Sequence, residues 1–269
     1  KVELLDKDSK TVSVAKEEAD KVVEKIYKPY HDRLRKIADE KIGVVLNDMV
    51  PQGKIYGVSI SFLKDTGMSS FITDVEKYYS KAEVVSFSYD YENLKLNKGE
   101  IKRKDIVYNY RYTGGDVTVF EMTGAQLKKY MEWSADYFDT IKKGDKNYRY
   151  NEERANLKYV TFDIFGGVKY KIDLRNPKGQ KITNLTLENG KKITPEMKIK
   201  VGMNFYRFEQ LIKKDGIFEE EDIKMLWSSK DEIGSESGTI QNMMIDYIKK
   251  VKNGVIDGKS HDNWEIIGL

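Results

Sequence analysis

The stretch of residues 115–138, GDVTVFEMTGAQLKKYMEWSADYF, constrains the fold more than any other part of the chain. It opens with an apolar run at 117–122 that is rich in β-formers and follows a Gly-Gly pair, which predicts a buried strand. Thr123 and Gln126 have the spacing of a capping box, in which each side chain bonds a free amide of the other residue. An apolar face then recurs with helical period at Leu127, Tyr130, Met131, Ser134 and Phe138. The stretch therefore predicts a strand, a tight cap and a helix folded back on a sheet.

The rest of the chain alternates between short strand patterns and helix patterns, which predicts an α+β fold. A helix is expected over residues 14–42, with Pro29 interrupting or kinking it because proline lacks the amide donor. Asp65-Thr66-Gly67 is expected to open a second helix, and residues 97–100 are expected to form a turn before a helix at 102–110. Other strands are expected at 42–48, 56–62, 83–89, 168–173, 182–187, 198–203 and 263–268, and other helices at 204–213 and 238–252.

Composition excludes several classes of protein and leaves others open. Lys and Arg number 47 against 44 Asp and Glu, and this balance argues against a surface that binds a nucleic-acid polymer. The chain has no Cys, so disulfides and thiolate chemistry are excluded. No apolar run approaches the roughly 20 residues of a membrane span. Because the chain opens at Lys1 without Met, we interpret it as an internal fragment or a processed form.

A search for a catalytic centre finds none in the sequence. A two-metal phosphoesterase needs a cluster of His, Asp and Asn ligands, but the only histidines are His31 and His261, far apart and outside any ligand-spaced motif. No G-x-S-x-G elbow and no Walker or dinucleotide glycine loop is present. We therefore expect no catalytic residue and no metal ligand within these 269 residues.

Several long segments carry a resemblance to a known family. TGAQLKKYMEWSADYF and FGGVKYKIDLRNPKGQKITNLTLENGKKI (165–193) resemble consecutive blocks in the C-terminal domain of the 5′-nucleotidase and 2′,3′-cyclic-nucleotide 2′-phosphodiesterase family. KPYHDRL (28–34) is similar to part of its linker helix, and GEIKRKDIVYNYRY (99–112) to its G-D-I-x-R-x-D-I-x-x-x-Y-x-Y segment. The resemblance runs from about residue 28 to the end of the chain.

The resemblance implies a fold, a division of the chain and a function. The fold would be a mixed, largely antiparallel sheet with flanking helices, preceded by a linker helix. Residues 1–40 would form the linker region, and residues 41–269 the substrate-binding domain. This domain would bind a nucleoside or nucleotide while an N-terminal metallophosphatase domain, absent from the sequence, hydrolyses the phosphate ester with a pair of divalent metal ions. The implied location is extracellular, cell-wall or periplasmic, in a secreted bacterial protein of nucleotide catabolism.

The resemblance also implies where the base would bind. The family stacks the base between two aromatic rings, a mode that tolerates different bases because each has a π-face. The first ring would come from FDIFGG, which offers Phe162 and Phe165, and the second from MNFYRF, which offers Phe205 and Tyr206 after Asn204. Asp215 would follow in the next loop. Core packing stays open as the alternative for each of the four aromatic residues.

Two departures from the family pattern keep other interpretations open. The glycine-rich loop that follows the second aromatic residue is replaced by RFEQLIKKDGIF, which has only the pair Asp215-Gly216. The N-G-G-x-R motif of the 5′-nucleotidase branch is replaced by SFSYDYENLK, without Arg. A degenerate, non-catalytic binding module derived from this domain therefore stays open, as does an autonomous enzyme with a carboxylate site. Arg103 could contact substrate or lie on a basic surface helix.

Overall fold

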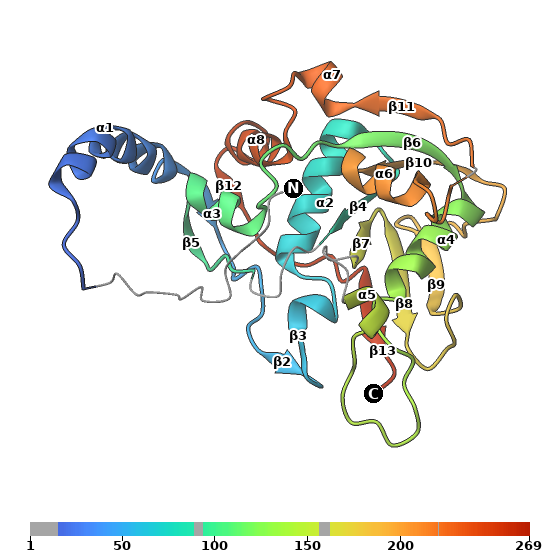
Figure 1. Ribbon diagram of the computed structural model, residues 1–269. Coiled ribbons are helices and arrows are strands. Elements are labelled where there is room, and N and C mark those ends of the chain that lie inside the picture. Colours follow the sequence, from blue (N-terminus) through green and yellow to red (C-terminus); the bar gives the residue numbers. More distant parts are fainter. Residues whose placement is uncertain (1–15, 89–93, 156–161, 220) are drawn as a thin grey trace, which may run out of the picture. The chain divides into compact units, whose positions relative to one another are not determined.

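The computed structural model describes residues 16–88, 94–155, 162–219 and 221–269 (Figure 1). The beginning of the predicted first helix, the last residue of the strand predicted at 83–89 and part of SFSYDYENLK lie outside these ranges. The chain divides into two compact units, Lys1–Glu40 and Lys41–Leu269. Each unit is described by itself below.

The first unit contains helix α1 (Lys21–Ala38). Asp20 caps its beginning, because the Asp20 side chain accepts hydrogen bonds from the amides of Val22 and Val23. The helix runs through Pro29 and ends only at Ala38, so the predicted interruption at Pro29 does not occur. Proline removes a single backbone donor, and the remaining turns on both sides of it are long enough to keep the helix continuous.

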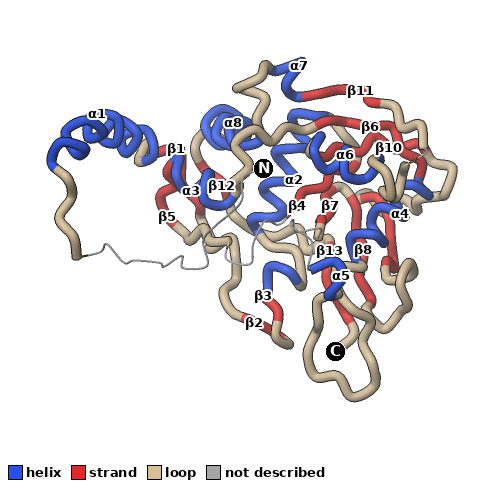
Figure 2. The backbone as a smooth tube through the Cα atoms, in the orientation of Figure 1, coloured by secondary structure: helices blue, strands red, loops and turns tan. Residues whose placement is uncertain are grey.

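The described residues of the second unit form four sheets, and Figure 2 shows the strands in red and the helices in blue. The largest sheet has the strand order β11-β6-β10-β4-β7, and two three-stranded sheets have the orders β12-β1-β5 and β13-β8-β9. A hairpin of β2 and β3 forms the fourth. The strands are β1 (Lys41–Val45), β2 (Lys54–Ile55), β3 (Val58–Ser59), β4 (Val84–Ser88), β5 (Gly99–Lys102), β6 (Thr118–Thr123), β7 (Asp163–Gly166), β8 (Val168–Asp173), β9 (Ile182–Leu187), β10 (Lys198–Met203), β11 (Met225–Ser228), β12 (Val255–Ile256) and β13 (Trp264–Ile267).

Most strand pairs are antiparallel, as predicted. Parallel pairing joins β1 to β12, β10 to β4 and β13 to β8. Antiparallel pairing joins β1 to β5, β6 to both β10 and β11, β4 to β7, β8 to β9 and β2 to β3. The fold is therefore a mixed, largely antiparallel α+β arrangement.

Helices α2 and α4 pack on the largest sheet and cover its central strands. The helices of the second unit are α2 (Gly67–Ser80), α3 (Arg103–Asn109), α4 (Gly124–Ala135), α5 (Glu152–Ala155), α6 (Phe205–Ile212), α7 (Ser229–Ile233) and α8 (Ile240–Asp246), with the 3₁₀ turn η1 (Ile60–Phe62) and the π-helical turn η2 (Tyr247–Val251). The predicted capping box of α4 is confirmed, since the Thr123 side chain accepts from the Gln126 amide and the Gln126 side chain accepts from the Thr123 amide. Leu127, Tyr130 and Met131 are buried on the face that packs against the sheet, as predicted.

Two local predictions are wrong. Residues 56–62 were expected to form one strand, but only Val58–Ser59 is a strand, and the 3₁₀ turn η1 follows it. Tyr56 has a φ of +49°, which breaks the extended conformation. The turn expected at 97–100 is shorter, because strand β5 already begins at Gly99 and pairs with β1.

The C-terminal strand is tied to the beginning of α2. The Asp65 carboxylate accepts hydrogen bonds from the hydroxyls of Ser69 and Ser70, and the Ser70 hydroxyl in turn accepts from the backbone amide of His261. His261 Nε2 lies 3.0 Å from both carboxylate oxygens of Asp74. Among the described residues, no helix combines the length and the apolar character that crossing a membrane requires.

Candidate functional site

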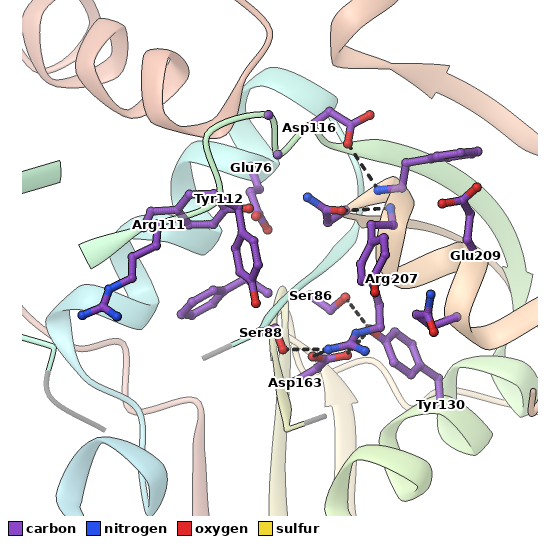
Figure 3. Close-up of a pocket in the computed structure, with 18 of the residues that line it drawn as sticks. Glu76, Ser86, Ser88, Arg111, Tyr112, Asp116, Tyr130, Asp163, Arg207 and Glu209 are labelled. Atoms are coloured by element: carbon purple, nitrogen blue, oxygen red, sulfur yellow. Dashed lines mark hydrogen bonds and ion pairs between the residues drawn. The ribbon is translucent and has the colours of Figure 1, made fainter. Parts of the chain in front are cut away.

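A cavity of about 920 Å³ opens where α6 meets the sheet (Figure 3). Its wall includes the end of β4, the segment 110–116 before β6, the middle of α4 and the start of β7. The first turn of α6 and the loop that follows α6 complete it, with Glu76 contributed by α2. Elements far apart in the sequence therefore converge on one hollow that is large enough for a small organic molecule.

The beginning of α6 is fixed by two polar contacts. Asn204 is the N-cap, and its side chain accepts a hydrogen bond of 2.9 Å from the Tyr206 amide. The Asp116 carboxylate accepts from the Phe205 amide at 3.4 Å. The Phe205 and Tyr206 side chains project from this first turn and are substantially exposed, with Tyr206 at 45%. The cap thus orients two aromatic rings at the cavity.

A glycine makes room for this arrangement. A Cβ at Gly115 would lie 2.7 Å from the Tyr110 hydroxyl and 3.0 Å from Asn204 Nδ2. Any larger residue at this position would displace the cap of α6 or the Tyr110 ring. The close approach explains the glycine that precedes the central strand.

The inner wall of the cavity holds a buried polar network around Asp163. The Tyr130 hydroxyl donates a 2.6 Å hydrogen bond to Asp163 Oδ2, and Arg207 Nη2 donates to Asp163 Oδ1 at 3.0 Å. Arg207 also donates to the Ser88 hydroxyl at 2.8 Å. Burial opposes the charge of Arg207, but the Asp163 carboxylate outweighs this and raises the pKa of the guanidinium. Burial, with Asp163 next, raises the pKa of Tyr130, so its phenol stays protonated.

A second buried acid, Glu76, reaches the cavity from α2 (Figure 3). Burial first, and the charge of Asp163 second, raise its pKa well above the ordinary 4.5. The neighbouring Tyr110 is also buried, and its pKa is raised by burial and then by Glu76, while a hydrogen bond with Asn204 acts in the opposite direction. This end of the cavity is therefore acidic in composition and poor in solvent.

The comparisons with known proteins assign the fold to a family. The model of the 5′-nucleotidase C-terminal domain matches residues 42–218. The chain belongs to this family. A trifunctional nucleotide phosphoesterase of Bacillus subtilis is 27% identical over 254 residues, covering 80% of this chain and 16% of that protein. A 2′,3′-cyclic-nucleotide 2′-phosphodiesterase/3′-nucleotidase of Haemophilus influenzae is 22% identical over 280 residues, covering 91% of this chain and 39% of that protein.

Solved structures share the fold of this 5′-nucleotidase C-terminal domain. A candidate 5′-nucleotidase of Staphylococcus aureus, solved with α-ketoglutarate, superposes with a TM-score of 0.72 at 19% identity, covering 93% of this chain and 44% of that chain. The 5′-nucleotidase precursor of Thermus thermophilus gives a TM-score of 0.65 at 14% identity, covering 92% and 43%. The chain thus spans less than half the length of each protein compared here.

The structure brings four of the six predicted site residues of the 5′-nucleotidase C-terminal domain together. Asn204, Phe205, Tyr206 and Asp215 all line the cavity. Asp215 has a φ of +64°, and a Cβ at the following Gly216 would lie 2.4 Å from the Leu211 carbonyl oxygen. The Asp215-Gly216 pair therefore supplies the tight turn beside the cavity even though the glycine run of the family is missing.

The structure does not place Phe162 and Phe165 at the cavity. Their side chains are 0% and 1% exposed, respectively. Phe162 packs in an aromatic cluster formed with Phe62, Tyr137, Phe138 and Trp264. Phe165 packs against the rings of Tyr130 and Tyr170. Phe165 lies in strand β7, which is buried along its whole length, and Phe162 directly precedes that strand, so both rings pack in the core.

Sequence reasoning missed Glu76, Tyr112, Asp163 and Arg207, all of which line the cavity. The signal for one of them was present, because Asp163 lies within an apolar run. A carboxylate within a segment that is otherwise built for burial is rarely fully buried without a reason, and this contrast marks Asp163. Glu76 lies between Asp74 and Lys77 in the sequence, so its neighbours give no such signal.

Proposed function

We propose that this domain recognises the nucleoside part of a nucleotide for a 5′-nucleotidase or a 2′,3′-cyclic-nucleotide phosphodiesterase. Membership in the 5′-nucleotidase C-terminal domain family supports the substrate class. The observation that carries the proposal is the cavity of about 920 Å³ with the exposed rings of Phe205 and Tyr206 at the capped end of α6. An aromatic side chain held by a helix cap is a rigid platform for a base.

Stacking supplies the binding energy in this proposal. A base stacked on an aromatic ring contributes roughly 1–3 kcal/mol by alanine substitution and does so for every base. Tyr206 is the stronger candidate for the platform, because Phe205 leans towards Phe208 with ring centroids 6.4 Å apart. Phe208 in turn stacks on Phe120 of β6 at 3.7 Å, which anchors the helix that carries both rings.

Hydrolysis is assigned in this proposal to a metallophosphatase domain outside these 269 residues. A pair of divalent metal ions there would generate the attacking hydroxide and stabilise the leaving oxygen. Among the described residues, no group of three or more His, Asp or Glu side chains is arranged to hold a metal ion. In this proposal the domain holds the base and ribose while the phosphate ester stays outside the cavity. The extracellular, cell-wall or periplasmic location of a secreted bacterial protein stays a prediction.

Calorimetric titration of the 269-residue chain with adenosine, AMP and 3′-AMP, without metal, tests the proposal. Saturable binding is expected for the wild type. Tyr206→Ala should weaken it at least about fivefold, the equivalent of about 1 kcal/mol of stacking. Tyr108→Ala is the matched control, because Tyr108 has the same exposure of 45% and does not line the cavity.

Two results would contradict the proposal. One is the absence of both binding heat and a thermal shift at millimolar nucleoside, which would indicate a module without nucleotide affinity. The other is an equal loss of affinity in the Tyr206 and Tyr108 variants, which would place the ligand away from the cavity.

A further inference from the structure

The Glu76 carboxyl group is buried at the cavity without a complete set of hydrogen bonds. Its side chain is 1% exposed and lines the cavity together with Tyr110, Asp116 and Asn204. Its Oε2 atom has no hydrogen-bond partner among the residues that the structure describes. A buried acceptor left without a partner costs about 1–3 kcal/mol of stability.

The fold itself gives no reason for a carboxyl group at this position. The other buried polar side chains of α2 are satisfied within the domain: Ser69 and Ser70 donate to Asp65, and the Thr73 hydroxyl donates to the Ser69 carbonyl oxygen. An apolar side chain of similar size in place of Glu76 would leave no unsatisfied atom. A polar group that the fold does not use, but that reaches the cavity, indicates a contact with a ligand.

The protonation state of Glu76 suits a neutral ligand group. Burial and the charge of Asp163 raise its pKa, and the groups around it are Asp163 from β7 and the phenol of Tyr110. Arg207, a buried cation that lines the same cavity, is paired with Asp163. A protonated carboxyl group keeps a carbonyl oxygen that accepts and gains a hydroxyl that donates. It can therefore bind a neutral polar group without a counter-ion.

The part of a nucleotide that reaches this end is the base. The phosphate must stay outside the cavity in order to be hydrolysed by another domain, which leaves the base to occupy it. The wall carries both acids (Asp116, Asp163) and cations (Arg111, Lys213, Lys230), so its charge alone does not decide which part of the nucleotide enters. Tyr110 and Tyr112 line the cavity with ring centroids 5.8 Å apart, so aromatic surface flanks the acid. A planar ring with a polar edge fits these surroundings better than a sugar.

We infer that Glu76 accepts a hydrogen bond from the exocyclic amino group of a bound base, and that the cavity thereby favours the amino-bearing bases adenine, cytosine and guanine over uracil, thymine and hypoxanthine. The inference rests on the proposed nucleoside function and adds the residue that reads the base edge. Stacking on an aromatic ring does not distinguish bases strongly, whereas a buried acceptor discriminates against a ligand that lacks the donor. Specificity would therefore reside in α2 and affinity in α6.

Comparing the affinities of two ligands for the wild type and for several variants of the 269-residue chain tests this contact. The ligands are adenosine and purine riboside, which carries hydrogen in place of the amino group, and the readout is calorimetry at neutral pH. Wild type should bind adenosine about tenfold tighter than purine riboside. Glu76→Met should bind the two ligands equally, and Glu76→Gln should keep the preference because its amide also offers an acceptor. Thr73→Ala is the matched control, since Thr73 is buried on the same helix but does not line the cavity.

A second measurement uses only the wild type, so it tests the contact even if a Glu76 variant does not fold. Adenosine labelled with ¹⁵N at its amino group should show a downfield shift of the amino proton signals when the chain is saturated. An unchanged amino resonance at saturation would overturn the inference.

The other outcomes separate this inference from the proposed function. A preference for adenosine that survives in Glu76→Met overturns the role of Glu76 and leaves nucleoside binding intact. Glu76 could instead contact the sugar. In that case the Glu76→Met substitution would weaken the binding of adenosine and of purine riboside alike, but not that of 2′-deoxyadenosine or 3′-deoxyadenosine, and this result would overturn the assignment to the base. Complete absence of adenosine binding by the wild type overturns the proposed function, and the inference with it.

Discussion

Arg207 Nε lies 2.8 Å from Asp163 Oδ2 in the interior of the domain, and this ion pair joins the first turn of α6 to strand β7. The Asp163 side chain is 1% exposed and that of Arg207 is 11% exposed. Two further bonds, to Ser88 and Tyr130, connect the pair to β4 and α4. The residue adjacent to Arg207 is Tyr206, so the buried pair sets the position of the ring that we propose as the platform for the base.

Breaking this pair should destabilise the domain strongly. Arg207→Met or Asp163→Asn leaves its partner buried without a counter-ion, which costs about 3–5 kcal/mol of the free energy of unfolding. Urea denaturation of the variants and the wild type measures this loss in the free energy of unfolding. Lys198→Met is the control, because solvent screens the exposed pair of Lys198 with Glu121, so that its loss should change the free energy of unfolding little. Similar losses in the buried and exposed variants would show that the Asp163 network is not integral to the fold.

Substitutions at Phe162 and Tyr206 should have opposite effects: the first should lower stability, and the second should lower nucleoside affinity. Phe162→Ala removes a ring from the aromatic cluster with Phe62 and Trp264, so the free energy of unfolding should fall by about 3–5 kcal/mol. Tyr206→Ala removes an exposed ring, so the free energy of unfolding should change by about 0.5 kcal/mol or less while nucleoside affinity falls. Urea denaturation and calorimetry on both variants check this. A Phe162 variant that folds stably but loses nucleoside binding would restore the stacking role first expected of that residue.

The raised pKa of Glu76 makes stability fall as pH rises above its ordinary value of 4.5. In that range the unfolded chain releases the proton while the folded chain retains it, because burial and Asp163 penalise the charged form. The decline should continue up to the folded pKa. Glu76→Gln cannot ionise and should lack this decline, so its free energy of unfolding relative to wild type should increase with pH. Urea unfolding of both proteins between pH 4 and pH 8 measures the difference, and parallel profiles would contradict it.

His261 should add a second pH-dependent contribution. Its hydrogen bond to Asp74 raises its pKa above 6.5, with the charges of Asp65 and Glu188 acting in the same direction. The pair therefore stabilises the folded state fully below pH 6.5, and this contribution to the free energy of unfolding is lost as pH rises through the pKa of His261 in the folded chain. His261→Gln should flatten the profile in that window. An NMR titration of the His261 ring gives the folded pKa directly, and a value at or below 6.5 would refute the pairing.

The sequence predicted the elements that depend on neighbouring residues. The capping box of Thr123 and Gln126 and the apolar face of α4 are local patterns, and both occur as expected. The helix expected at 204–213 is likewise present, as α6 (Phe205–Ile212). Strand β5 was missed because Gly99–Lys102 is extended only through its pairing with β1, more than fifty residues earlier in the chain.

By itself, the sequence determined the family, the order of most helices and strands, and the part of the cavity built on α6. Only the tertiary structure decided which polar and aromatic residues are buried and which face the cavity. Phe162 and Tyr206 are both aromatic residues in blocks that resemble the same family, yet one is enclosed by a cluster of aromatic rings in the core and the other projects from a helix cap. Asp163 is tolerated in a buried strand because Arg207, 44 residues later, pairs with it. Burial depends on contacts between distant segments, and no local pattern records those contacts.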